Sequence, residues 1–204
     1  MQPAIVAFDQ KKRIASLWLL SASFLASIVL IRPYWQHGPI HEFIEVSGLM
    51  LIFLAILGRL WSILYIGAHK NRKLVDIGPY SMTRNPLYLS SLVGILGVGL
   101  ISGSLILAAV MTFAFYSVFK YTALREAVFL EHLFGAAYRE YAKKTPLFLP
   151  RLSLYRTATG VRFSQKALTS TFFDSLFLLA LFPLLEGIEY LRLSGHLPFV
   201  VTMF

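Results

Sequence analysis

The sequence predicts an all-α fold, a polytopic helical bundle in a membrane, with about five transmembrane helices and short cytoplasmic helices. Three observations support this prediction. Hydrophobic residues make up 57% of the 204 positions and charged residues only 14%, whereas soluble domains carry about 25% charged residues. Long apolar runs alternate with polar stretches. Lysine and arginine gather in alternate polar stretches, as they do on cytoplasmic loops.

Chain length and cysteine content further limit the domain count and the kinds of site that this protein can contain. A chain of 204 residues is expected to form a single integral membrane domain, residues 1–204. Because it contains no cysteine, it has no disulfide, no thiolate metal ligand and no cysteine nucleophile. A net charge of +9 would suit nucleic acid, but in so apolar a chain it indicates contact with anionic lipid. We therefore expect membrane lipids as partners and no nucleic acid.

Two apolar runs open the chain. Ile14–Ile31 has no small-residue cleavage site after it and therefore indicates a transmembrane helix rather than a signal peptide. Val46–Ile66 is about long enough for the second span. It contains Arg59, the one basic residue well inside a predicted span. Such a residue either belongs to a functional site or extends its head group toward the nearer membrane surface, and the sequence leaves both interpretations open.

The stretch between these two runs, Arg32–Glu45, is predicted as an interfacial loop. His37, His41 and Glu45 have a spacing that would place them on one face of a helix, where they could bind a metal ion. Gly38-Pro39 interrupts such a helix, so we favour the loop and predict no bound metal.

Residues 87–119 are almost uncharged and too long for one ordinary span of about 20 residues. Ser102-Gly103-Ser104 lies in the middle, and we therefore predict two helices joined by a tight turn. A nucleotide-binding loop is a poor interpretation of the glycines here, because no strand precedes them and no polar group accompanies them. Close packing of membrane helices explains them better.

The largest polar stretch, 120–166, is predicted to hold short cytoplasmic helices. Arg125–Phe134 is expected to be one helix that ends at a glycine, and Ala136–Lys144 a second. Leu147–Leu149 lies between two prolines and is predicted to dock against the bundle, while 151–166 is basic and is expected on the membrane surface. Beyond it, Ala167–Leu193 is the fifth predicted span, and Leu197–Phe204 is an apolar tail expected at the interface.

The basic residues predict the orientation. With five spans, 16 of the 19 lysines and arginines fall on one side: three precede the first span, four lie within 69–86 and nine within 120–166. The positive-inside rule then places the N-terminus in the cytoplasm. We predict that the cytoplasmic segments 69–86 and 120–166 form one site together, at the cytoplasmic face of the plasma membrane or an inner membrane.

One polar interruption, residues 74–90, organises this half of the chain. Gly78-Pro79 is a turn signal. Asn85-Pro86 starts a helix, because asparagine is a good N-cap and proline fits the first helical turn. The backbone position of Arg84 is then fixed on both sides, just before the N-terminus of that helix. The alternative interpretation is a membrane-surface loop whose arginine meets lipid phosphate.

The two cytoplasmic segments carry motifs in a fixed order. That order is Gly78-Pro79-Tyr80, Arg84-Asn85-Pro86-Leu87-Tyr88-Leu89-Ser90, an apolar hairpin, Arg125-Glu126, Leu130, Phe134-Gly135, Tyr138, Tyr141, Pro146 and Pro150. Over roughly residues 55–151 it resembles the isoprenylcysteine carboxyl methyltransferase and phospholipid methyltransferase superfamily, whose pattern is R-H-P-x-Y-x-G, a hydrophobic stretch and E-E. The chain has Asn85, Ser90 and Ala127 in place of the histidine, glycine and second glutamate.

The resemblance implies an S-adenosylmethionine-dependent methyltransferase that releases S-adenosylhomocysteine and uses no metal. It implies a cofactor pocket on the cytoplasmic side, with a tunnel from the lipid for an amphiphilic acceptor, a lipid or lipid-like small molecule. Arg84 and Glu126 are the predicted catalytic residues. The predicted cofactor-binding residues are Leu74, Val75, Gly78, Tyr80, Asn85, Pro86, Tyr88, Leu89, Glu126, Tyr138 and Tyr141.

Elementary chemistry agrees with these roles. Methyl transfer from a sulfonium requires positioning and exclusion of water, without a metal or a covalent intermediate. Arg84 suits a carboxylate through a bidentate contact, and Glu126 suits an amino group or ribose hydroxyls. The four tyrosines could enclose the adenine or attract the sulfonium. A solvated ion pair for Glu126 and an interfacial aromatic belt for the tyrosines are the alternatives.

Two classes of function remain open from the sequence. The first is a membrane methyltransferase similar to the isoprenylcysteine carboxyl methyltransferases, whose acceptor is a prenylcysteine carboxylate, a phospholipid amine or a small thiol. The second is a non-catalytic scaffold or lipid-binding protein with the same fold. The absence of the second glutamate, which Ala127 replaces, favours this class.

Overall fold

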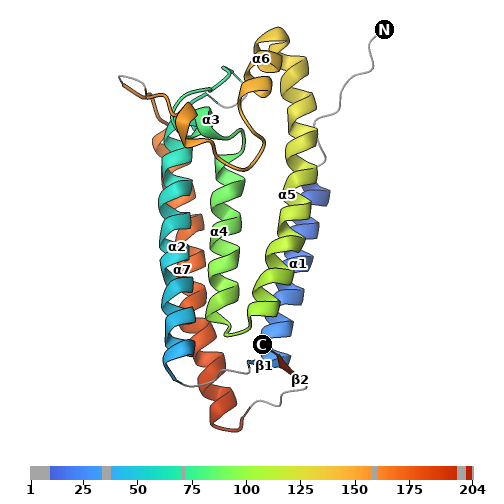
Figure 1. Cartoon of the computed structure of the whole chain (residues 1–204), viewed down its shortest axis with the longest axis vertical. Coiled ribbons are helices and arrows are strands. Elements are labelled where there is room, and N and C mark those ends of the chain that lie inside the picture. The colour runs from blue at the N-terminus through green and yellow to red at the C-terminus, as the bar shows by residue number, and fades with distance from the viewer. Residues whose placement is uncertain (1–9, 34–37, 70–71, 158–159, 197–200, 204) are drawn as a thin grey trace.

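The computed structural model describes residues 10–33, 38–69, 72–157, 160–196 and 201–203. Five helices run side by side along the long axis of the molecule (Figure 1). They are α1 (Gln10–Leu30), α2 (Pro39–Ile66), α4 (Pro86–Ile101), α5 (Leu105–Phe134) and α7 (Gln165–Leu193). The short helices α3 (Pro79–Met82) and α6 (Ala136–Lys144) lie at the same end of this bundle, with the 3-10 turn Leu152–Leu154. The predicted all-α membrane bundle is confirmed.

Three of the described helices, α2, α5 and α7, are long and apolar enough to cross a membrane. The apolar part of α1, Ile14–Leu30, and the whole of α4 are shorter. The 16 residues of α4 rise about 24 Å, less than the ~30 Å of a hydrocarbon core. Because α4 packs against both α2 and α5, its short length leaves space between these longer helices at the α3–α6 end.

Helix α2 starts earlier than predicted. It begins at Pro39, so the second half of the predicted loop Arg32–Glu45 is helical and that prediction is wrong there. Proline suits the first turn of a helix because its missing N–H would have no helical partner. Gly38, at φ 108°, supplies the preceding turn. The Gly-Pro pair therefore starts this helix, whereas we expected it to interrupt one.

Helix α5 also differs from the prediction. The tight turn at Ser102–Ser104 is confirmed, with Gly103 at φ 78° and the Ser104 side chain accepting a hydrogen bond from the backbone of Leu107. The separate helix predicted at Arg125–Phe134 is wrong, because α5 continues without a break to Phe134. Neither glycine nor proline occurs between 105 and 134, so the change from apolar to polar residues does not end the helix.

The glycines of α4 allow close contact with α2, as predicted. A Cβ atom on Gly97 would lie 2.6 Å from the carbonyl oxygen of Gly48, and a Cβ on Gly48 would lie equally close to the oxygen of Gly97. Further toward the α3–α6 end, a Cβ on Gly58 would lie 2.5 Å from Oγ of Ser90. Gly58 therefore provides the space that Ser90 needs on α4, where the superfamily pattern has glycine.

The opposite end of the bundle holds a short parallel strand pair. β1 (Ile31–Pro33) pairs with β2 (Val201–Met203), with Ile31 opposite Val201. Part of the tail predicted at the interface thus forms a strand, and residues 197–200 of that tail lie outside the described residues.

Candidate active site

A cavity of about 560 Å³ lies at the α3–α6 end, where the short α4 begins. Its volume falls within the ~300–1,000 Å³ typical of small-molecule and cofactor sites. Helices α2 to α7 and the loop before α3 all contribute to its wall. It therefore combines residues of both polar segments, 69–86 and 120–166.

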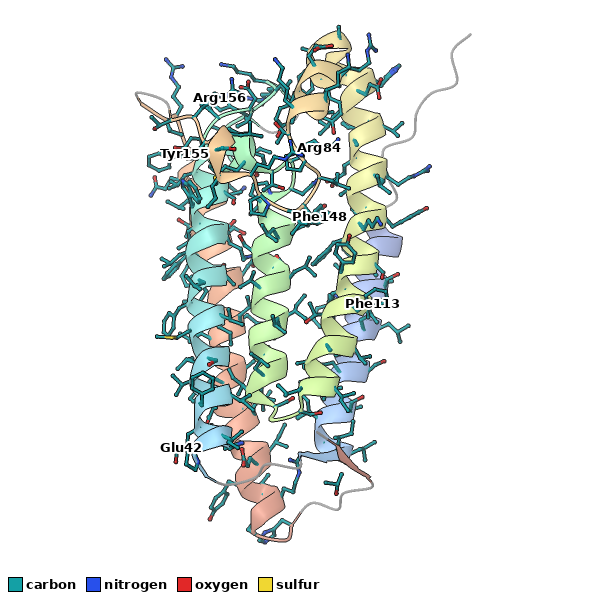
Figure 2. The ribbon with its side chains drawn as sticks, in the orientation of Figure 1. Glu42, Arg84, Phe113, Phe148, Tyr155 and Arg156 are labelled. Atoms are coloured by element: carbon teal, nitrogen blue, oxygen red, sulfur yellow. The ribbon has the colours of Figure 1, made fainter. Side chains whose placement is uncertain are left out.

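The backbone on both sides of Arg84 is fixed by hydrogen bonds. The Arg84 N–H donates to the carbonyl oxygen of Pro146 at 2.9 Å. The Thr83 hydroxyl and the Asn85 amide nitrogen both donate to the carbonyl oxygen of Leu147, at 3.2 and 3.1 Å. Asn85 occupies the predicted N-cap position of α4, but its side chain makes no capping bond, because its amide is used on Leu147. Figure 2 shows Arg84 at this end of the bundle, between α4 and α6.

The turn before α3 requires glycine. Gly78 has φ 59°, and a Cβ atom there would lie 2.3 Å from the ring of Tyr65. Ser81 closes the turn, since its hydroxyl donates to the Gly78 carbonyl at 2.7 Å. Gly78 does not belong to the cavity wall, and it acts by placing the backbone that leads to Arg84.

The guanidinium of Arg84 lies on the cavity wall with hydrogen-bonding capacity to spare. Its Nε is buried and has no partner among the described residues. The hydroxyl of Tyr138 accepts a hydrogen bond from the same side chain. Burial raises the pKa of Tyr138, and the bond with Arg84 opposes that rise. A buried N–H without a partner is costly, so this arrangement favours an added acceptor such as a carboxylate.

Glu126 lies on the same wall and is held by a tyrosine of α4. The Tyr88 hydroxyl donates to Oε1 of Glu126 at 2.9 Å. The ring of Tyr88 is itself fixed, because it stacks on Phe119 with centroids 5.1 Å apart. This carboxylate is therefore oriented by packed neighbours, which the alternative interpretation of a solvated ion pair does not describe.

Three further tyrosines add to the polar part of the wall. Tyr141 donates from its hydroxyl to the carbonyl oxygen of Tyr80 at 2.7 Å and meets the ring of Tyr138 edge-on. Burial raises the pKa of Tyr80 and of Tyr141 above the ordinary value. All three tyrosines thus stay neutral at physiological pH and present hydroxyl groups and ring faces.

Most of the predicted site residues meet at this cavity. Its wall includes Leu74, Val75, Tyr80, Arg84, Asn85, Pro86, Tyr88, Glu126, Tyr138 and Tyr141. Gly78 and Leu89 lie outside it. The sequence did not indicate the part of the wall built by α2 and α7, which consists of Ile63, Ile66, Gly67, Ala167, Ser170 and Thr171. Small and apolar residues of this kind resemble lipid-facing positions, and no local signal separates the two.

Two other candidates lie elsewhere. His41 and Glu45 sit in the first turns of α2, with His41 Nε2 3.9 Å from Glu45 and 3.6 Å from Glu189 of α7. Their predicted companion, His37, lies outside the described residues. Within the described ranges no group of three histidine or acidic side chains could hold a metal ion. The predicted absence of a metal remains a prediction.

Arg59 makes contacts inside the bundle. Its Nε donates to Ser175 Oγ of α7 at 3.1 Å, and its Nη1 donates to Ser91 Oγ of α4 at 2.6 Å. Each of these three residues lies one helical turn from a cavity-wall residue, namely Ile63, Thr171 and Leu87. Arg59 therefore joins α2, α4 and α7 just beyond the cavity.

The apolar spans and this end cavity indicate an integral membrane protein with a cavity the size of a small-molecule site. The model of the phospholipid methyltransferase family matches residues 43–137. The chain belongs to this family, within the superfamily that also contains the isoprenylcysteine carboxyl methyltransferases.

Two relatives match almost the whole chain. The cobalt-zinc-cadmium resistance protein CzcN of Cupriavidus metallidurans is 36% identical over 188 residues, which cover 92% of this chain and 87% of CzcN. The nickel-cobalt-cadmium resistance protein NccN of Alcaligenes xylosoxydans xylosoxydans is 31% identical over 209 residues, which cover 100% of this chain and 98% of NccN. No solved structure matches the chain.

Proposed function

We propose that this protein transfers a methyl group from S-adenosylmethionine to an amphiphilic acceptor in the cavity beside Arg84. The family implies this donor. The observation that carries the proposal is a pair of opposite charges that line one cavity, the Arg84 guanidinium with its unpartnered buried Nε and the oriented carboxylate of Glu126. The amino acid end of the donor carries a carboxylate and an ammonium group, which match these two charges.

S-adenosylmethionine supplies a methyl group already activated on a sulfonium. In the proposed site Arg84 holds the donor carboxylate, and Glu126 accepts hydrogen bonds from the amino group or the ribose hydroxyls. Tyr138 and Tyr141 remain neutral and add aromatic walls that suit an adenine ring or a cation. A donor and an acceptor bound together in this cavity are held in position and partly shielded from water, which is the main help that such a displacement needs.

We propose the acceptor only as a chemical class, an amphiphilic small molecule. Ile63, Ile66 and Ala167 give the cavity an apolar side beside its polar one, which suits a molecule with a polar head and an apolar tail. A prenylcysteine carboxylate, a phospholipid amine and a thiol are the candidate acceptor groups.

The second candidate function is a non-catalytic lipid-binding protein, and Ala127 favours it because this residue lines the cavity in place of the second glutamate.

We also propose a cytoplasmic location for the cavity, in the plasma membrane or an inner membrane. The basic residues of 69–86 and 120–166 support this orientation. Cysteine labelling at Arg72 and Ser153, both exposed, tests it in a chain without native cysteine. Labelling of the two positions from opposite sides of the membrane would contradict it.

The names of CzcN and NccN connect those relatives with metal resistance. We propose that this chain contributes to metal tolerance through methylation at the Arg84 cavity. The test compares cobalt and cadmium tolerance of a host that expresses wild type or Arg84→Lys at equal levels. Equal protection by both would separate tolerance from this cavity.

The decisive experiment for the proposed activity supplies methyl-labelled S-adenosylmethionine to membranes that contain the protein and searches for labelled products. We expect a labelled lipid or lipid-like product that depends on Arg84 and identifies the acceptor. S-adenosylhomocysteine binding without any labelled product would favour the non-catalytic alternative. The absence of both would contradict the proposal.

A further inference from the structure

Large apolar side chains near the cavity point away from the protein. Leu149 and Leu152 are 81% and 74% exposed, and Tyr155 is also exposed. Their neighbour Phe148 is buried at 8% exposure and packs edge-on against Tyr116 of α5, with centroids 5.5 Å apart. The segment between the two prolines therefore docks through Phe148 and the partly buried Leu147. Leu149, and Leu152 just beyond the segment, remain exposed.

This apolar surface continues the outer face of α2. The ring of Tyr155 packs on Trp61 of α2, with centroids 6.0 Å apart. Leu57 and Leu54 follow at helical spacing on the same face of α2 and are exposed. Since α2 is long and apolar enough to cross a membrane, this exposed apolar face is suited to contact with lipid. Tryptophan and tyrosine concentrate where lipid meets water, so the Trp61–Tyr155 contact marks that boundary.

The charge around the surface is positive. Residues 142–173 contain six lysines and arginines and no acidic residue. Arg151, Arg156 and Arg162 are exposed. Figure 2 shows Arg156 nearer the end of the bundle than Tyr155. Apolar side chains beside the span with basic side chains beyond them are typical of a segment that lies in the interface of an anionic leaflet.

The same segment supports the loop that carries Arg84. Besides the bond from Arg84 to Pro146, the Arg151 N–H donates to the Met82 carbonyl at 3.0 Å, and the Gly78 N–H donates to the Arg156 carbonyl at 2.7 Å. Three backbone hydrogen bonds thus attach the loop 78–84 to 146–156 along its length, and side-chain bonds at Ser81 and Thr83 add to them. A change in the position of one segment moves the other.

We propose that residues 149–156 are seated in the head-group region of the surrounding leaflet and bind anionic phospholipid. Leu149, Leu152 and Tyr155 enter the acyl boundary. Arg151 and Arg162 pair with lipid phosphates, since Arg156 is already paired with Asp76 at 3.1 Å. The seated segment then holds the Arg84 loop in the position that binds the donor. This link to Arg84 rests on the proposed function. The occupant is phospholipid, because the surface continues a lipid-facing helix and carries the complementary charge.

A depth measurement tests the seating without any assay of activity. Leu152→Cys, in the otherwise cysteine-free chain, is labelled with an environment-sensitive fluorophore in nanodiscs of phosphatidylcholine and phosphatidylglycerol. Ala136→Cys, exposed at the start of α6, is the matched control. We expect a spin-labelled lipid to quench the label at 152 strongly and the label at 136 weakly, with iodide giving the reverse order.

Equal quenching of the two labels by iodide would overturn the proposal. Protection of the label at 152 that grows with protein concentration instead of lipid content would assign the surface to a second copy of the chain and would also overturn it. The charge is tested with Arg151→Gln combined with Arg162→Gln, which we expect to weaken the effect of phosphatidylglycerol on lipid quenching about fivefold or more. An unchanged lipid preference would remove the anionic specificity.

The link to Arg84 has its own measurement. S-adenosylhomocysteine affinity is compared between nanodiscs with and without phosphatidylglycerol, for wild type and for Leu149→Ser combined with Leu152→Ser. We expect weaker affinity in the absence of anionic lipid and in the serine variant. Identical affinities in all four samples would overturn the link. If wild type binds no S-adenosylhomocysteine while the quenching result holds, the proposed function fails and the seating stands.

Discussion

Two partly buried arginines of this bundle have opposite surroundings. Arg59, within α2, uses Nε and Nη1 on serines of α7 and α4, and it is not part of the cavity wall. Arg84, in the loop before α4, is fixed through its backbone, lies on the cavity wall, and has a buried Nε without a partner among the described residues. The first side chain joins helices, and the second faces a cavity with a donor unused.

The comparison shows why burial alone does not identify a functional arginine. An ionisable residue inside a membrane span is a functional candidate by default, and on that basis Arg59 is the stronger choice. Its side chain, however, is occupied by hydroxyl groups of its own protein. Arg84 lies outside any span, and its significance comes from the fixed backbone and the unmet donor beside Glu126. The following predictions test this contrast.

The largest effect is expected at Arg84. Arg84→Lys removes the planar fork that holds a carboxylate, and we predict at least a hundred-fold loss of methyl transfer, about 2.7 kcal/mol in the barrier. Thermal stability is expected to change little. The measurement is the initial rate with methyl-labelled donor and membrane lipid extract. A rate near wild type would make Arg84 a surface anchor and would place the site elsewhere.

Glu126→Gln is expected to weaken the affinity for S-adenosylhomocysteine about ten- to a hundred-fold, since a hydrogen bond to a charged group contributes about 1.5–3 kcal/mol. Tyr88→Phe keeps the ring on Phe119 but removes the hydroxyl that orients this carboxylate, so a smaller loss is expected. Titration calorimetry with S-adenosylhomocysteine on both variants shows which one loses more affinity. Wild-type affinity in Glu126→Gln would remove this residue from the donor site.

The opposite pattern is predicted for Arg59. Lysine cannot contact both serines with the same geometry, so Arg59→Lys is expected to lower the free energy of unfolding by about 1.5–3 kcal/mol. The affinity for S-adenosylhomocysteine is expected to stay within about twofold, because Arg59 does not line the cavity. Denaturation and binding are measured on the same preparation. Unchanged stability with lost binding would reverse the assignment of the two arginines.

The smallest effect concerns Tyr138. Because burial raises its pKa, the folded state favours the neutral phenol, and the stability this gives is complete below pH ~10, the ordinary tyrosine value. It is lost as the pH rises above that value through the raised pKa. Between pH 10 and 11.5 we expect wild type to lose more thermal stability than Tyr138→Phe. Parallel curves for the two proteins would contradict this expectation.

The sequence predicted the local backbone on both sides of Arg84 well. Gly78-Pro79 and Asn85-Pro86 are strong backbone signals, and they set the position of Arg84. The same kind of signal misled at Gly38-Pro39, because a glycine-proline pair can end one segment or begin the next helix. The continuation of α5 to Phe134 was missed for a different reason. The change from apolar to polar residues marks the membrane surface, and it does not mark the end of a helix.

The non-local part of the site could not be predicted. Ile63 and Ala167 reach the cavity from helices distant in sequence, and nothing in an isolated apolar run shows which face meets a cavity and which meets lipid. The capping role expected for Asn85 failed for a related reason. Its amide found a tertiary acceptor at Leu147, far away in the chain, and local propensity does not include such competition.

The central claim is that the Arg84 cavity binds the methyl donor, and one calorimetric series tests it most directly. Purified wild type, Arg84→Lys and Arg59→Lys are titrated with S-adenosylhomocysteine in the same nanodiscs. We predict binding by wild type, an affinity reduced about tenfold or more in Arg84→Lys, and an almost unchanged affinity in Arg59→Lys. Absence of binding by wild type, or an equal loss in the two variants, would contradict the claim.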